Sequence, residues 1–65
     1  MMNVDSTRRH LTTLLTIDEV AAYLAISPRT VRRMIDDKEL RCVQVGRQKR
    51  IDPRDLEAFV KANKT

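Results

Sequence analysis

Residues 16–35 read TIDEVAAYLAISPRTVRRMI, and this stretch holds two helix starts eleven residues apart. At the first, Thr16 and Glu19 form the T-x-x-E pattern of a capping box, in which two side chains satisfy otherwise unpaired backbone amides. At the second, Ser27 offers a capping hydroxyl, and Pro28 has the fixed φ that suits the first helical position. The sequence therefore predicts two short helices, over residues 17–24 and 28–37, joined by almost no loop.

Apolar residues gather on one face of each predicted helix. The helical period groups Ile17, Val20, Ala21 and Leu24 in the first helix and Val31, Met34 and Ile35 in the second. Only Ala25 and Ile26 separate the helices, so we expect them to cross at a steep angle, as in a helix-turn-helix. We expect Ile26 to fill the corner between them.

The outer face of the second predicted helix carries three arginines within five residues. Arg29 and Arg33 point away from the apolar face, and Arg32 and Thr30 flank them. Like charges this close on a helix repel by a few tenths of a kcal/mol per pair, which a sequence tolerates most simply when a phosphate or guanine is the partner. We therefore expect this helix to enter the major groove of double-stranded DNA. The candidate contacts are Ser27, Arg29, Thr30, Arg32 and Arg33.

Positive charge is concentrated in the middle of the chain. The 65 residues carry a net charge of +4 and have a pI near 9.8. Residues 29–50 hold eight Lys or Arg against three Asp or Glu, whereas all other residues together hold five against six. This distribution favours a polyanionic partner bound by one face, the alternative being a basic surface that is merely solvated.

After Leu40 the apolar pattern changes to a period of two. Residues 42–51 read CVQVGRQKRI, which predicts a hairpin with Gly46 at a turn position of positive φ. We expect Val43, Val45 and Ile51 to face inward. The turn and second strand carry Arg47, Gln48, Lys49 and Arg50. Beside a cationic helix, such a hairpin is typical of a wing that follows the DNA backbone or enters the minor groove.

A third predicted helix closes the core. Asp52 and Pro53 combine a cap with a first-turn proline, and Leu56, Phe59 and Val60 then recur at helical spacing to about residue 63. We expect this helix to pack against the first helix and the sheet. The predicted fold is mostly α with a small β-hairpin, a winged helix-turn-helix in the order helix, helix, two-stranded wing, helix.

Residues 1–13 show no clear period, so we expect a loose N-terminal arm and a domain that spans residues 14–65. Arg8, Arg9 and His10 are candidates for phosphate contacts, the alternative being a disordered tail. Thr16 and Tyr23 are two further candidates outside the second helix and the wing. For Tyr23, a partly buried position at the edge of the first helix is an equal alternative.

The residue types give no basis for catalysis. Cys42 is the one cysteine, which excludes an internal disulfide, and its apolar surroundings predict a small buried hydrophobe. His10 has no partner for metal binding, and Asp36 and Asp37 lie about 100° apart on a helix, so they do not form a catalytic carboxylate pair. We expect no enzyme activity, no cofactor, no metal and no small-molecule substrate.

Neither a membrane span nor a secretion signal is expected. No run of about 18 apolar residues occurs, and the N-terminus lacks the apolar core of a signal peptide. The expected location is the cytoplasm.

Several of these stretches together resemble the excisionase family of small phage DNA-binding proteins, in the MerR-like winged-helix group. They are residues 15–21 (LTIDEVA), 27–31 (SPRTV), 45–47 (VGR) with 50–51 (RI), and 56–59 (LEAF). The resemblance covers about residues 14–61, and the order and spacing of the motifs are more specific than any motif alone. The most specific group that the sequence resembles is the Xis proteins of mycobacteriophages.

This resemblance implies a recombination directionality factor that performs no chemistry. Such proteins bind DNA at the arm of a prophage attachment site, bend it and help to seat the phage integrase, which then excises rather than integrates. The implied partners are DNA, the integrase and further copies of the protein on adjacent sites. By position, the family's recognition-helix contacts fall on Arg29, Thr30, Arg32 and Arg33, and its wing on residues 47–50.

Four positions depart from the family pattern. Ala25 and Lys38 stand where glycine is frequent, Arg41 where proline is common, and Lys49 where an aromatic residue is frequent in the wing. The last change favours a looser, more electrostatic wing. None of the four removes an expected DNA contact.

Two other functions remain as alternatives. One is a small transcriptional regulator on the same fold, although regulators of this group add an effector domain or a dimerisation helix, and no heptad pattern is found up to Thr65. The other is a protein-binding adaptor, against which the arginines at positions 29 and 33 argue.

Overall fold

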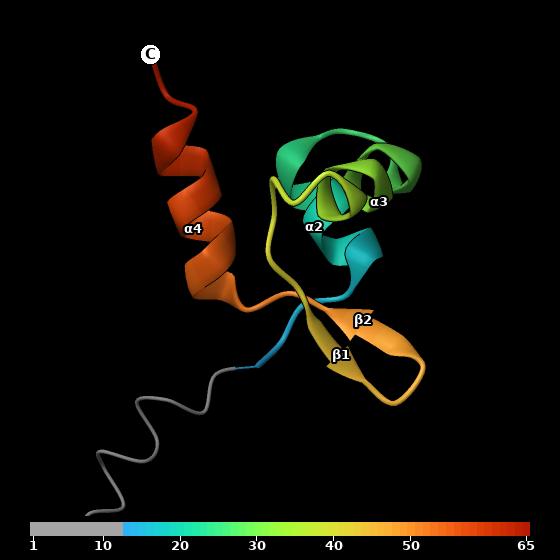
Figure 1. The fold of residues 1–65 in the computed structure, drawn as a ribbon. Helices are drawn as coiled ribbons and strands as arrows, with labels where there is room; N and C mark the ends of the chain where they lie inside the picture. Colours follow the sequence, from blue (N-terminus) through green and yellow to red (C-terminus); the bar gives the residue numbers. More distant parts are fainter. Residues whose placement is uncertain (1–12) are drawn as a thin grey trace, which may run out of the picture.

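The computed structural model describes residues 13–65, which Figure 1 draws in colour. These residues form, in order, α2 (Ile17–Leu24), α3 (Pro28–Asp36), β1 (Val43–Val45), β2 (Gln48–Arg50) and α4 (Pro53–Ala62). The two strands pair antiparallel. The winged helix-turn-helix expected from the sequence is confirmed, and the predicted ends of the helices agree with the structure to within a residue.

The three helices within residues 13–65 all begin at the predicted caps. The Thr16 hydroxyl accepts a hydrogen bond from the Glu19 amide at 3.0 Å, and the Glu19 carboxylate accepts one from the Thr16 amide at 2.9 Å, which completes the capping box. The Ser27 hydroxyl caps α3, and the Asp52 carboxylate caps α4. The helix starts are therefore fixed by local sequence.

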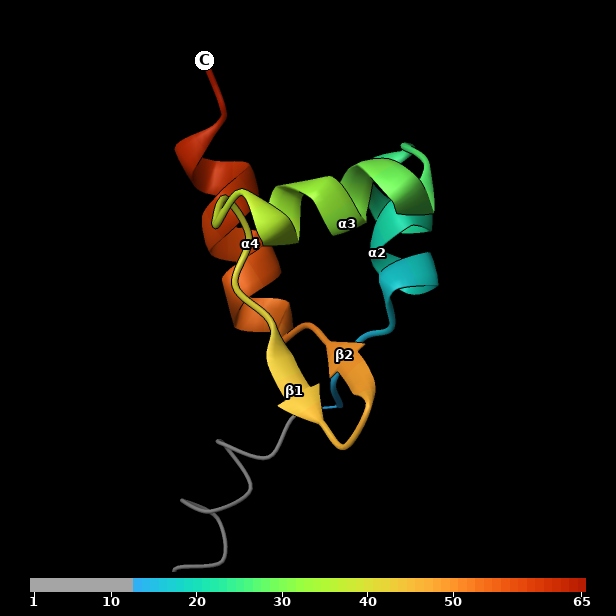
Figure 2. The ribbon, with the colours of Figure 1, turned by 45° about the vertical axis from the view of Figure 1, so that its right-hand side comes forward.

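The turn between α2 and α3 sets their steep crossing, and Figure 2 shows α3 running across the end of α2. Ala25 takes the left-handed conformation, with φ 59° and ψ 43°. The Ile26 amide then donates to the Ala21 carbonyl at 3.0 Å, and its half-buried side chain packs against the core in the corner, as expected.

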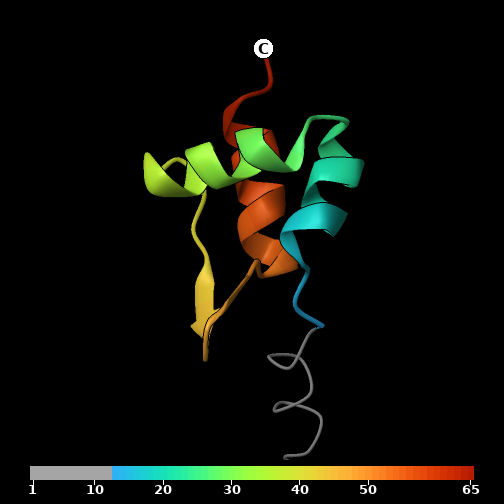
Figure 3. The same ribbon diagram turned by 90° about the vertical axis from the view of Figure 1, so that its right-hand side faces the viewer.

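One apolar core joins the elements. The buried residues are Val20, Ala21, Val31, Met34, Ile35, Leu40, Ile51 and Leu56. Leu40, which was not among the expected core residues, is only 2% exposed. Figures 1 and 3 show α4 standing beside the pair of α2 and α3. Of its side chains Leu56 is buried, while Phe59 and Val60 are half-buried against the core.

The expected inward face of the wing is wrong for two of its three residues. Ile51 is fully buried, but Val43 is 39% and Val45 50% exposed. The strand register pairs Val43 with Arg50, and its continuation places Ile51 opposite Cys42. Opposed residues share a face, and neighbours along a strand alternate, so Ile51 and the half-buried Cys42 share the inner face. The two valines lie on the outer one.

Within residues 13–65, no helix has the length and apolar character needed to span a membrane.

Leu15 pairs with Ile51 in an isolated antiparallel bridge, so the segment before α2 runs alongside the end of β2. This bridge brings the wing close to the beginning of α2.

Candidate nucleic-acid interface

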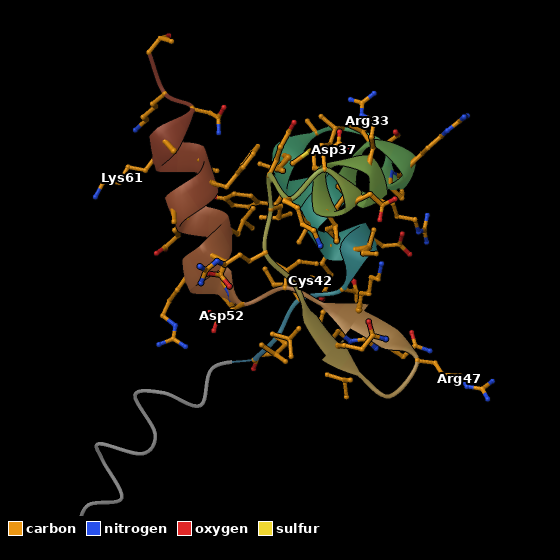
Figure 4. All side chains as sticks on the ribbon, in the orientation of Figure 1. Arg33, Asp37, Cys42, Arg47, Asp52 and Lys61 are labelled. Atoms are coloured by element: carbon orange, nitrogen blue, oxygen red, sulfur yellow. The ribbon has the colours of Figure 1, made fainter. Side chains whose placement is uncertain are left out.

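The outer face of α3 is cationic, as the sequence predicts. Val31, Met34 and Ile35 are buried and fix the rotation of the helix, which leaves Arg29, Arg32 and Arg33 exposed. Figure 4 shows the Arg33 side chain projecting outward from α3. Three guanidinium groups are therefore presented on a short, well-anchored helix.

The start of α3 is held by two hydroxyls. The Ser27 hydroxyl accepts from the Thr30 amide at 3.1 Å and lies 2.9 Å from the Thr30 hydroxyl. Exposed hydroxyls at a helix N-terminus are well placed for a phosphate, because the helix dipole and the first amides favour an anion there.

The wing turn presents Arg47 outward. Gly46 has a φ of +60° while Arg47 does not have a positive φ, the combination typical of a type II′ turn with glycine first. A Cβ at Gly46 would contact nothing within 4 Å, so backbone conformation rather than space requires the glycine. The Gln44 side-chain amide donates to the Gly46 carbonyl at 2.9 Å. Figure 4 shows Arg47 extending from this turn away from the helices.

An open cleft lies where the start of α2, the α3 helix and the wing meet, and we call it the α3–wing cleft. Its cations are Arg32 of α3 and Arg47, Lys49 and Arg50 of the wing. Arg50 is half-buried and donates from Nη1 to the Lys49 carbonyl at 3.0 Å, which orients its guanidinium. Charges from two separate elements thus converge on one surface.

The α3–wing cleft also contains one ion pair. Lys49 Nζ lies 3.9 Å from Asp36 Oδ1, and the two side chains are 42% and 70% exposed. Exposed pairs of this length contribute little to stability. The pair joins the wing to the last residue of α3 without holding the Lys49 ammonium strongly, so a phosphate can compete for it.

A family model for the helix-turn-helix domain matches residues 14–64. The chain belongs to this family. The family includes excisionase-like DNA-binding proteins, and its fold supports binding of double-stranded DNA. No curated protein and no solved structure matched the chain.

This helix-turn-helix domain brings together only some of the residues selected from the sequence. The α3–wing cleft is lined by Thr16, Arg32 and all four selected wing residues, Arg47, Gln48, Lys49 and Arg50. Arg29 and Arg33 lie on the outer face of α3 but outside the lining of the cleft, and Ser27 and Thr30 lie at the start of the helix. Their roles in DNA contact remain predictions.

Other selected residues lie elsewhere. Tyr23 is 67% exposed and lines a separate apolar groove with Leu15, Pro53 and Leu56, between α2 and α4. It is thus exposed rather than partly buried, and it is absent from the lining of the α3–wing cleft. The selected arm residues Arg8, Arg9 and His10 lie outside the described residues. Among residues 13–65, no three His, Cys, Asp or Glu side chains gather into a set that could hold a metal ion.

Two acidic residues of the α3–wing cleft were missed by the sequence analysis. Asp18 and Asp36 both belong to its lining. Asp36 follows Arg32 by four residues, so helical spacing already places the two on one stripe. The sequence alone draws attention to Asp36 only through its neighbour Asp37, with which it does not form a carboxylate pair.

Proposed function

We propose that this protein binds and bends DNA at the arm of a prophage attachment site and directs the phage integrase toward excision. The observation that carries the proposal is the convergence of α3 and wing cations on one open cleft. A helix in the major groove and a wing on nearby phosphates hold the duplex at two points, an arrangement that suits a protein that shapes DNA. The resemblance of residues 15–21 and 27–31 to excisionases supports the role in excision.

Each part of the surface has a distinct task in this proposal. Arg29, Arg32 and Arg33 approach base edges, where arginine pairs with the two acceptors of guanine. Residues 47–50 of the wing contact phosphates or the minor groove and supply most of the salt-dependent affinity. The partners are DNA, the integrase and neighbouring copies of this protein, and the protein itself performs no chemistry in the cytoplasm of the bacterial host.

A reconstituted recombination assay tests this proposal. The protein is added to a phage integrase, with either the two prophage junctions or the phage and host attachment sites of that integrase as DNA. Excision should rise and integration should fall. The double variant Arg32→Ala/Arg47→Ala should lose both effects, because it removes a cation from each side of the cleft.

Lys61→Ala is the control for the loss of a positive charge outside the cleft. Figure 4 shows Lys61 on the side of α4 that faces away from α3, so this variant should act like the wild type. If both reactions are indifferent to the protein while it still binds the DNA, the excision role is wrong. A promoter-reporter response to the same DNA-bound protein would then favour a small transcriptional regulator.

A further inference from the structure

Asp36 places a carboxylate on the outward side of α3, within a surface that is otherwise cationic. It is the last residue of α3, its side chain is 70% exposed, and it lines the α3–wing cleft beside Arg32. Asp36 follows Arg32 by four residues and Arg29 by seven, so the three residues lie along one side of the helix. A carboxylate there is repelled by phosphates, so its partner on a duplex must be a hydrogen-bond donor.

The Asp36 carboxylate contributes little to the stability of the folded domain. A negative charge at the C-terminal end of a helix opposes the helix dipole. Within residues 13–65, its one ion pair is the 3.9 Å contact with Lys49, between two well-exposed side chains. The ion pair does, however, position the two groups, because it places the Lys49 ammonium of the wing next to the Asp36 carboxylate at the edge of the cleft.

We propose that Asp36 determines sequence specificity by accepting a hydrogen bond from the N4 amino group of a cytosine in the major groove. The cytosine amino group is a donor there, whereas guanine N7 and O6 and thymine O4 are acceptors that a carboxylate disfavours. Adenine also offers a donor, N6, but its neighbouring N7 is an acceptor that repels the second carboxylate oxygen, so cytosine is favoured over adenine. Lys49 binds the adjacent phosphate, either after it leaves its ion pair with Asp36 or while it still contacts Asp36. This inference rests on the proposed entry of α3 into the major groove.

The test is selection of binding sites from a pool of randomised duplexes, with the wild type, Asp36→Ala and Asp37→Ala compared. Asp37 is the matched control, since it is the next residue, is also exposed and is absent from the lining of the cleft. Both variants remove one negative charge, so both should bind random DNA more tightly. Only Asp36→Ala should lose the preference for one C·G pair, by about 10-fold or more.

A second variant separates base reading from simple charge removal. Asp36→Asn keeps an acceptor and adds a donor, a combination that pairs with adenine, so the preferred base at that position should move from cytosine toward adenine. An Asp36→Ala variant that selects the same sites as the wild type would overturn the proposal. If the wild type selects no sequence, both this proposal and the proposed sequence recognition by α3 are wrong. If only the recombination assay fails, the role in excision is wrong, and the proposed contact between Asp36 and cytosine still stands.

Discussion

Leu15 and Ile51 exchange two backbone hydrogen bonds of 2.8 Å, each amide donating to the other residue's carbonyl. Leu15 immediately precedes Thr16, the N-cap of α2, and Ile51 immediately follows β2. The Ile51 side chain is also fully buried in the core. The wing is therefore fixed to the helix-turn-helix unit through both backbone and side chain, which keeps its cations in a constant position relative to α3.

Truncation of Ile51 should unfold most of the domain. Ile51→Ala removes buried methyl groups and leaves a cavity, at a loss of about 2–5 kcal/mol, whereas Ile51→Val loses about 0.5–1.5 kcal/mol. A chain of this size has a free energy of unfolding of only about 3–5 kcal/mol. Circular dichroism with urea titration should show a folded Ile51→Val variant and a largely unfolded Ile51→Ala variant. Equal midpoints would show that the wing is not part of the cooperative core.

Glycine at two positions of positive φ should stabilise the protein. Ala25 has a φ of 59° and Lys38 a φ of 65°. The left-handed conformation costs an L-residue about 1–2 kcal/mol, while glycine loses about 0.5–1 kcal/mol more than alanine in chain entropy on folding. Ala25→Gly and Lys38→Gly should therefore each raise the free energy of unfolding by up to about 1 kcal/mol.

Thermal and urea unfolding measure this gain, with Ala22→Gly as control. Ala22 is exposed within α2, where glycine should destabilise by about 1 kcal/mol. If all three glycine variants lose stability alike, the backbone strain at residues 25 and 38 is not released by glycine.

The cap of α4 should make stability depend on pH in strongly acidic solution. The Arg54 side chain donates to Asp52 at 3.1 Å and 2.7 Å, and the Arg54 amide donates at 2.8 Å. These hydrogen bonds lower the pKa of Asp52 from 3.8 to about 2. Because the folded-state pKa is the lower one, this stabilisation is complete above about pH 4 and is lost as the pH falls through about 2.

Asp52→Asn isolates this effect, since asparagine still caps a helix but carries no charge. The urea midpoint of the wild type should exceed that of the variant at pH 5, and the difference should shrink as the pH falls from 4 to 2. Other carboxylates titrate in both proteins and cancel in the comparison. A difference that stays constant down to pH 2 would contradict the assigned cause.

Local signals explain how much of the fold the sequence revealed. Caps at Thr16, Ser27 and Asp52 act within three residues, so they mark helix starts without any knowledge of the tertiary structure. The apolar faces of the helices could be predicted because each helix is longer than two turns, enough for the helical period to show. Gly46 indicated the turn of the wing because glycine, unlike other residues, adopts a positive φ readily.

The remaining features depend on contacts between distant segments. Strands of three residues contain too few alternations to decide a face, so Val43 and Val45 were assigned to the wrong one. The bridge from Leu15 to Ile51 joins residues 36 positions apart and leaves no local pattern. For the same reason, the sequence did not predict that Asp36 and Lys49 would meet across the cleft.

Two arginines should affect DNA binding in different ways. Arg33→Ala should lower the discrimination between a specific and a random duplex by about 1–3 kcal/mol, because arginine on a recognition helix reads guanine. Arg47→Ala, at the wing turn, should weaken both duplexes similarly and lower the slope of log affinity against log salt by about 1. Fluorescence anisotropy across a salt series measures both quantities, and Lys61→Ala should alter neither. An equal loss on the two duplexes for Arg33→Ala would argue against base reading by that residue.

Tight binding should require several copies of this protein side by side. A single module of this kind buries only about 600–1,000 Å² on DNA, which supports modest affinity by itself. On a fragment with adjacent sites, gel shifts should therefore show cooperative filling at lower protein concentration than on a single site. Insertion of about five base pairs between sites, half a helical turn, should abolish this cooperativity because it moves neighbouring copies to opposite sides of the duplex. A single tight, non-cooperative complex on the multi-site fragment would show that one copy suffices.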